Sequence, residues 1–129
     1  MKTIIAGSRT GFRYLDVANA MSILEDFPTE VVSGGAPGVD TFAIDWAEKT
    51  KIDLTIMPAN WGRWGNSAGY RRNARMADYA DMCIAVWDGF SPGTRHMINL
   101  MVQRNKPVYV FNKKDMSLRS VTKAIPTGE

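Results

Sequence analysis

Short apolar runs alternate along the chain with longer segments in which apolar residues recur at helical spacing. The short runs predict β-strands at residues 2–6, 31–32, 52–57, 81–87 and 108–111. The longer segments predict helices that begin near Tyr14, Val39, Ser67 and Thr94. We expect the first helix to continue to Phe27-Pro28, because proline cannot extend it.

The fourth apolar run is continuous from Cys83 to Val86, which is typical of a strand in a parallel sheet covered on both faces. Strands that alternate with helices form right-handed βα units. We therefore predict an α/β fold: a Rossmann-like, doubly wound, mainly parallel sheet of about five strands with helices on both faces. Residues 1–112 form this domain in the prediction, and residues 113–129 form a C-terminal extension that packs on it or frays.

Small residues gather where three of the predicted strands end, at residues 7–11, 33–38 and 89–94. The carboxyl ends of parallel strands share one edge of the sheet, where ligands bind. Glycine lets the backbone come close to a ligand, and a helix that starts there favours phosphate. A single anionic ligand therefore accounts for all three turns together.

Arginine adds to this picture. Four arginines fall within thirteen residues, namely Arg63, Arg71, Arg72 and Arg75, and Arg9, Arg13 and Arg95 lie at other predicted loop ends. Guanidinium groups at loops suit bidentate contacts with phosphate or carboxylate. The segment 59–69 is a long predicted loop with Trp61 and Trp64 among glycines, and each tryptophan either packs as an anchor or stacks on a base.

Composition restricts the classes of protein to which the chain can belong. The 129 residues carry a net charge of +3, and no apolar run approaches the 18 or more residues of a membrane span. The first nine residues become polar too early for a signal peptide. A single cysteine, Cys83, excludes an internal disulfide and favours a reducing, cytoplasmic location. With one cysteine and one histidine, His96, a Cys/His zinc site cannot form, so we expect no metal.

The small-residue turns together resemble the SLOG superfamily, and within it the small single-domain YspA-related group formerly called DUF2493. The resemblance covers residues 2–111. The matching residues are Gly7-Ser8-Arg9, Ser33–Asp40 with Ala43, Pro58–Trp61, Gly69, Arg72-Asn73 with Met76, Trp87–Gly89 and Ser91–Thr94.

This resemblance implies a Rossmann-like fold that binds a nucleotide or nucleotide-derived molecule, as a sensor or a sequestering module. Some relatives belong to phage genomes or bacterial conflict systems, and a homo-oligomer, a dimer or tetramer, is expected. The ligand-binding residues that we expect are Gly7, Ser8, Arg9, Gly34, Gly35, Ala36, Gly38, Asp40, Trp61, Arg72, Asn73, Asp88, Ser91, Gly93 and Thr94.

Two alternatives stay open. The superfamily includes phosphoribohydrolases, whose Pro-Gly-Gly-x-Gly-Thr loop precedes a catalytic glutamate; here no acid follows Thr94 until Asp115, so we lean against an enzyme. A nucleotide N-glycosidase would need Asp88 or Asp40, the acids in the predicted loops. The DNA-processing protein DprA also resembles this chain, and binding of single-stranded nucleic acid through the arginines and tryptophans is the second alternative.

Overall fold

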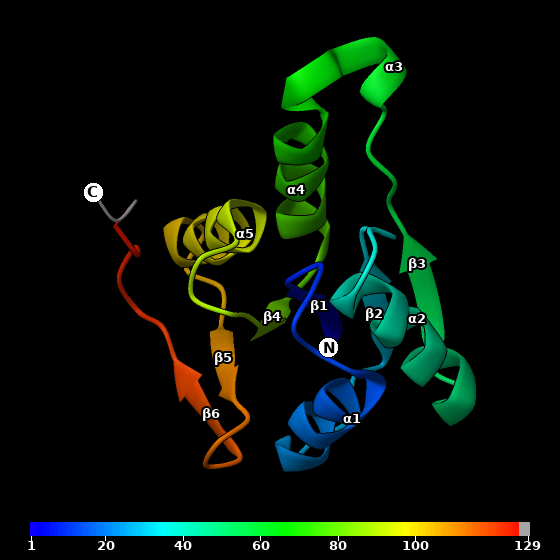
Figure 1. Cartoon of the computed structure of the whole chain (residues 1–129), viewed down its shortest axis with the longest axis vertical. Helices are drawn as coiled ribbons and strands as arrows, with labels where there is room; N and C mark the ends of the chain where they lie inside the picture. Colours follow the sequence, from blue (N-terminus) through cyan, green and yellow to red (C-terminus); the bar gives the residue numbers. More distant parts are fainter. Residues whose placement is uncertain (127–129) are drawn as a thin grey trace.

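The computed structural model describes residues 1–126, and its central element is a six-stranded sheet of order β3-β2-β1-β4-β5-β6 (Figure 1). The first five strands pair in parallel, and β6 pairs antiparallel to β5. The predicted α/β class and the Rossmann-like, mainly parallel sheet are confirmed, with a sixth strand added. The strands are β1 (Lys2–Gly7), β2 (Glu30–Ser33), β3 (Asp53–Ile56), β4 (Met82–Val86), β5 (Val108–Asn112) and β6 (Ser117–Ser120).

Helices cover both faces of this sheet. Figure 1 shows α1 and α2 packed together on one side, and α4 and α5 packed together on the other. A short projecting arm, residues 61–67, precedes α4 at the far end of the molecule in this view. The helices are α1 (Tyr14–Ile23), α2 (Val39–Thr50), α3 (Trp61–Trp64), the 3-10 turn η1 (Gly65–Ser67), α4 (Ala68–Tyr79) and α5 (Pro92–Gln103).

Each face of the sheet has its own apolar core. Ile4 and Ala85 pack against α4 and α5, whereas their neighbours Ile5 and Ile84 pack against α1 and α2. Successive side chains of a strand point to opposite faces, so a strand buried on both faces must be apolar at every position. This explains why the apolar runs of the central strands are continuous.

Two local predictions were wrong. The helix α1 ends at Ile23, before the predicted end at Phe27-Pro28, because Leu24 adopts an extended conformation (φ −64°, ψ 133°). Phe27 and Pro28 lie in the connection between α1 and β2. The predicted loop 59–69 is largely helical, since it forms α3 and η1. The Asn60 side chain accepts a hydrogen bond from the backbone N–H of Arg63 at 3.1 Å, which caps α3.

The segment after β5 turns back and adds β6 to the edge of the sheet. Further on, Asn99 of α5 exchanges two hydrogen bonds with the backbone of Ile125, at 2.9 and 2.7 Å. The last three residues of the predicted extension, 127–129, lie outside the described residues. Within the described part of the chain, no helix has the length and apolar character that a membrane span needs.

Candidate functional site

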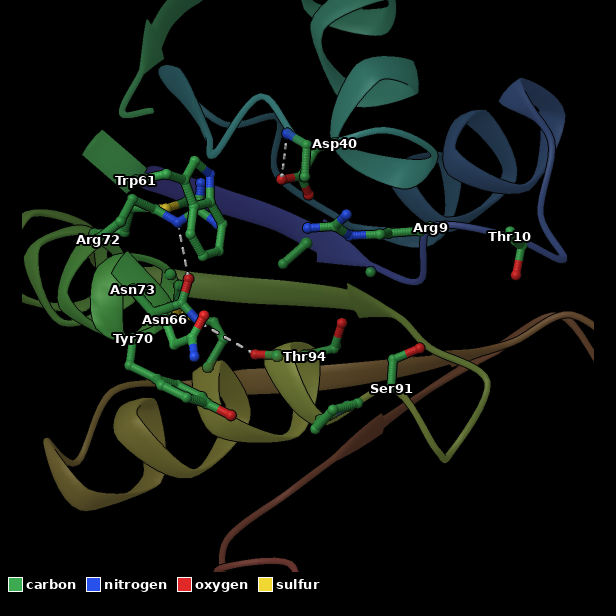
Figure 2. Close-up of a pocket in the computed structure, with 18 residues that line it drawn as sticks. Arg9, Thr10, Asp40, Trp61, Asn66, Tyr70, Arg72, Asn73, Ser91 and Thr94 are labelled. Atoms are coloured by element: carbon green, nitrogen blue, oxygen red, sulfur yellow. Dashed lines mark hydrogen bonds between the residues drawn. The ribbon is translucent and has the colours of Figure 1, made fainter. Parts of the chain in front are cut away.

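A cavity of about 400 Å³ lies at the carboxyl edge of the sheet, on the side covered by α4 and α5 (Figure 2). The strand order places the reversal of winding between β1 and β4, and open α/β sheets bind ligands at such a point. Four segments line the cavity: the turn after β1, the start of α2, the arm together with α4, and the first turn of α5. Of the predicted ligand-binding residues, those that line it are Gly7, Arg9, Ala36, Asp40, Trp61, Arg72, Asn73, Ser91, Gly93 and Thr94.

The glycine-rich turn before α2 uses its backbone donors internally. The N–H of Gly35 donates to Ser33 Oγ at 3.2 Å, and the N–H of Ala36 donates to Asp40 Oδ2 at 3.2 Å. The N–H of Val39, the first residue of α2, donates to the carbonyl of Ser8 at 3.1 Å. These groups are therefore already satisfied without a ligand.

The glycines of this turn permit close packing and do not line the cavity. A Cβ atom at Gly34 would collide with the Arg72 guanidinium, and one at Gly38 would collide with the backbone of Arg9. Gly35 and Gly38 also have positive φ, at 73° and 84°, which glycine adopts without strain. The turn thus serves to bring Arg72 and the turn after β1 against α2.

Arg72 is anchored where two strands end. Its Nη1 donates to the carbonyl of Gly34 at 2.7 Å, and its Nε donates to Asn73 Oδ1 at 3.1 Å. Burial lowers the pKa of Arg72, while the charge of Asp40 opposes that shift. The guanidinium stays far from deprotonation at neutral pH and brings a fixed positive charge to the cavity wall.

Asp40 brings a buried carboxyl to the same wall, and its side chain is 8% exposed. Burial raises its pKa to about 6, although the Ala36 N–H and the charges of Arg72 and Arg9 all act in the opposite direction. Figure 2 shows the exposed Arg9 side chain reaching from the turn after β1 toward Asp40. The cavity therefore combines two guanidinium groups with one carboxyl that titrates near neutrality.

The N-terminus of α5 forms the opposite wall. The hydroxyl oxygen of its N-cap residue, Ser91, lies 3.0 Å from Asp88 Oδ2 and 3.2 Å from Ser8 Oγ, and makes no capping bond. Within residues 1–126, the backbone N–H groups of Gly93 and Thr94 have no hydrogen-bond partner. The first N–H groups of a helix have no partner inside the helix, so these donors are available to an anion.

Asn73 holds this wall in place. Its Nδ2 donates to the carbonyl of Gly93 at 3.1 Å and lies 3.2 Å from Nδ1 of His96. His96 is half-buried and packs edge-on against Tyr70, with 4.6 Å between ring centroids. Burial, and then the charge of Arg104, lower the pKa of His96. Asn73 thus connects α4 to α5, and His96 does not line the cavity.

Two aromatic side chains, one from the arm and one from α4, form a rim of the cavity. Trp61 and Tyr70 line the cavity while remaining 52% and 49% exposed. Trp64 does not line it; the guanidiniums of Arg63 and Arg71 lie over its ring, at 4.7 and 3.9 Å from the centroid. The cavity therefore has two partly exposed aromatic rings in its wall.

Two predicted residues, Ser8 and Asp88, position the turns and do not line this cavity. Ser8 is buried, and its Oγ accepts a hydrogen bond from the backbone N–H of Asp88 at 3.0 Å. Asp88 Oδ1 accepts from the N–H groups of Phe90 and Ser91, both at 2.8 Å. Burial alone would raise the pKa of Asp88, but these hydrogen bonds hold it below its ordinary value. Asp88 thus acts as a turn residue.

Several residues of the cavity wall were not among the predicted ligand-binding residues. Its apolar part is formed by Met76 and Met97, of which Met76 was named only as a residue that carries the family resemblance. Thr10, Asn66 and Pro92 also line the cavity, and their side-chain types gave no comparable signal. No group of three or more His, Cys, Asp or Glu side chains within the described residues is arranged to hold a metal ion.

Fold and cavity together define a Rossmann-like α/β protein with a ligand-sized cavity at the point where the sheet reverses its winding. The chain is 37% identical over 90 aligned residues to the Gene 61 protein of Mycobacterium phage D29, which covers 65% of this chain and 72% of that protein. It belongs to the same family as this phage protein. No family model matches the chain, and no solved structure matches it.

Proposed function

We propose that the protein binds a nucleotide or nucleotide-derived small molecule in this cavity, as a sensor or a sequestering module. One observation carries the proposal: the unpartnered first turn of α5 opens into a cavity that also holds the Arg9 and Arg72 guanidiniums. Helix N-termini and arginines are the groups that proteins use to bind phosphate.

The proposed pose follows from the two ends of the cavity. The phosphate accepts hydrogen bonds from the N–H groups of Gly93 and Thr94 and from Arg9. The base stacks at the rim, on Trp61 or Tyr70, which are exposed enough to receive it. A volume of about 400 Å³ falls in the usual range of about 300–1,000 Å³ for small-molecule sites.

The sequence resemblance also supports a nucleotide-derived ligand. The turns resemble those of the SLOG superfamily, whose members bind such molecules. The kinship with a phage protein is compatible with a role in phage infection, and some members of the superfamily are associated with phage genomes. Sensing or sequestering a signalling nucleotide would need no catalytic group, in keeping with the missing acid after Thr94.

The proposal is tested by titration calorimetry against mononucleotides, dinucleotides and cyclic nucleotides. We expect at least one to bind, and Arg9→Ala to weaken its binding about tenfold or more, because a charge-assisted contact is lost. Arg75→Ala is the matched control, since this exposed arginine of α4 does not line the cavity. Absence of binding across the panel, or equal losses in both variants, would refute the proposal.

A second candidate function is hydrolysis of an N-glycosidic bond, and the burial of Asp40 beside the cavity favours it. A pKa of about 6 suits a group that must hold a proton and release it near neutrality. In this reaction the bond between C1′ and the base nitrogen breaks, and the Asp40 carboxyl protonates the base. Water bonds to C1′ and returns its proton to the Asp40 carboxylate.

Chromatography of nucleotides incubated with the protein tests this second candidate. Hydrolysis predicts release of free base that disappears in Asp40→Asn and persists in Asp53→Asn, which alters an exposed carboxyl of β3. Nucleotide that stays intact after long incubation, while still binding in calorimetry, would leave the binding module as the function.

We also propose that the protein forms a homo-oligomer, a dimer or tetramer. Phe90 is 80% exposed at the tip of the turn before α5, and Trp64 is 39% exposed on the arm. Large aromatic side chains at the surface are typical of contacts between chains. Light scattering should give a mass above that of one chain. We expect Phe90→Ser or Trp64→Ser to lower this mass. A monomer at micromolar concentration would contradict the proposal.

A further inference from the structure

A second cavity, of about 680 Å³, opens at the carboxyl edge of the sheet beside the first. It is bounded by the turn after β1, the turn after β4 and the hairpin that joins β5 to β6. The two cavities share the first two of these turns. Thr10 lines the first cavity and Gly11 the second; Ser91 lines the first and Asp88 the second.

Hydrogen bonds hold together the two turns that the cavities share. The hydroxyl of the buried Ser8 accepts from the N–H of Asp88 at 3.0 Å and lies 3.2 Å from the hydroxyl of Ser91. Figure 2 shows Thr10 and Ser91 at the side of the first cavity that faces these turns. A ligand that continues past the N-terminus of α5 therefore has to cross only the two shared turns to reach the second cavity.

The second cavity has its own cations. The ammonium of Lys113 donates to the carbonyl of Gly11 at 3.2 Å and lies 5.0 Å from the centroid of the Phe12 ring. Lys114 and Arg119 are exposed, and among the described residues their side chains form no hydrogen bond or ion pair. Positive charge that is not neutralised inside the protein attracts an anionic group.

The lining of this cavity carries three cations, Lys113, Lys114 and Arg119, against two carboxylates, Asp88 and Asp115, and no ion pair joins these groups in the described part of the chain. Asp115 Oδ1 accepts from the hydroxyl of Ser117 at 2.6 Å, and Asp88 is held by its own turn. Phe12 and Trp87 add aromatic surface to the wall. Cations and aromatic rings in the wall of the same cavity suit a phosphorylated sugar or nucleoside.

We propose that the second cavity binds the distal, phosphorylated half of an extended nucleotide whose proximal nucleotide occupies the first cavity. The ligand class is then a dinucleotide-type molecule, with Lys114 and Arg119 contacting the distal phosphate group and the aromatic wall contacting the attached ring. This inference rests on the proposed function, because the proximal half uses the α5 N-terminus and Arg9.

Calorimetry at one fixed ionic strength compares AMP, GMP, CMP and UMP with the matching 5′-phosphorylated linear dinucleotides. For the best-bound base we expect the dinucleotide to bind about tenfold tighter than the mononucleotide or more. The double variant Lys114→Ala/Arg119→Ala should remove this advantage and leave mononucleotide affinity unchanged. The control Arg75→Ala/Lys123→Ala loses the same net charge outside both cavities and should retain the advantage.

The outcomes separate the two proposals. Mononucleotide binding that depends on Arg9, with dinucleotides bound equally well, overturns the second cavity and leaves the proposed function standing. A dinucleotide advantage that survives Lys114→Ala/Arg119→Ala, or falls equally in the control, also overturns the assignment of the second cavity. If neither class of probe binds, both proposals fail together.

Discussion

At the scale of single residues, the most unusual group of the cavity is a carboxyl whose ionised form is destabilised by burial. Asp40 receives one backbone hydrogen bond and lies near two guanidiniums, yet burial outweighs these effects and raises its pKa to about 6. The ionised form is therefore disfavoured in the folded protein relative to the unfolded chain, where the pKa is about 3.9.

This shift predicts a specific pH dependence of stability. Because the folded-state pKa is raised, the folded chain binds the Asp40 proton more tightly, and this contribution to stability is lost as pH rises from about 4 through about 6. Asp40→Asn removes the ionisation. It should match the wild type at pH 4 and be more stable by about 2–3 kcal/mol at pH 8.

Urea unfolding at both pH values measures this difference. The matched control is Asp53→Asn, which removes an exposed carboxyl without a side-chain hydrogen bond in the described chain and so measures the effect of losing a surface charge. An Asp40→Asn variant that loses stability at pH 8 would mean that the guanidiniums outweigh burial.

At the scale of elements, α4 depends on a lysine from outside the helix. Its C-terminal carbonyls, those of Ala77, Asp78 and Ala80, accept hydrogen bonds from Lys106 Nζ at 2.7, 3.0 and 2.8 Å. A cation at this end also matches the helix dipole. Since α4 carries Arg72 and Asn73 to the cavity, this contact supports the site from a distance.

We predict that Lys106→Met destabilises the protein by about 1–3 kcal/mol, because methionine keeps the apolar stem and leaves carbonyls without their charged donor. Chemical denaturation of Lys106→Met beside Lys123→Met, an exposed lysine with no hydrogen bond in the described chain, measures the difference. Equal stability of the two variants would show that water replaces the ammonium without loss.

The elements also show what the sequence could and could not predict. Continuous apolar runs predicted the central strands because both faces of the sheet are covered, and that signal is local. The hydrogen bonds in and around the turn 33–38 come from the side chain of Asp40, from Arg72 of α4 and from Ser8 of the turn after β1. Such tertiary contacts leave no periodic signal, so glycines that permit packing look the same as glycines that bind phosphate.

The helical arm was missed for a related reason. None of the residues of α3 and η1 is buried, so the segment has no apolar stripe to reveal a helix. Its indication is the cap at Asn60, a single residue among tryptophans and glycines. The sequence predicted the location of the site, since predicted residues from all four segments line the first cavity. It did not predict that Asp88 lies at the neighbouring cavity.

At the scale of the whole molecule, stability is distributed unevenly between the sheet and the arm. The central strands β1 and β4 are almost wholly buried between two helical layers. The main contacts of the arm are those among its own elements and with α4, yet it supplies Trp61 to the cavity. Elements with little buried apolar surface open at low free energy, and binding elements are often of this kind.

Hydrogen exchange should reveal this gradient. We predict that the backbone amides of residues 61–67 exchange fastest among the helical segments and those of β1 and β4 slowest. A nucleotide that binds as proposed should slow exchange at residues 61–67 and at Gly93 and Thr94, because it stacks on Trp61 and accepts from the α5 N-terminus. Mass spectrometry with and without the ligand measures both effects. Protection confined to the hairpin between β5 and β6 would instead place the ligand in the second cavity alone.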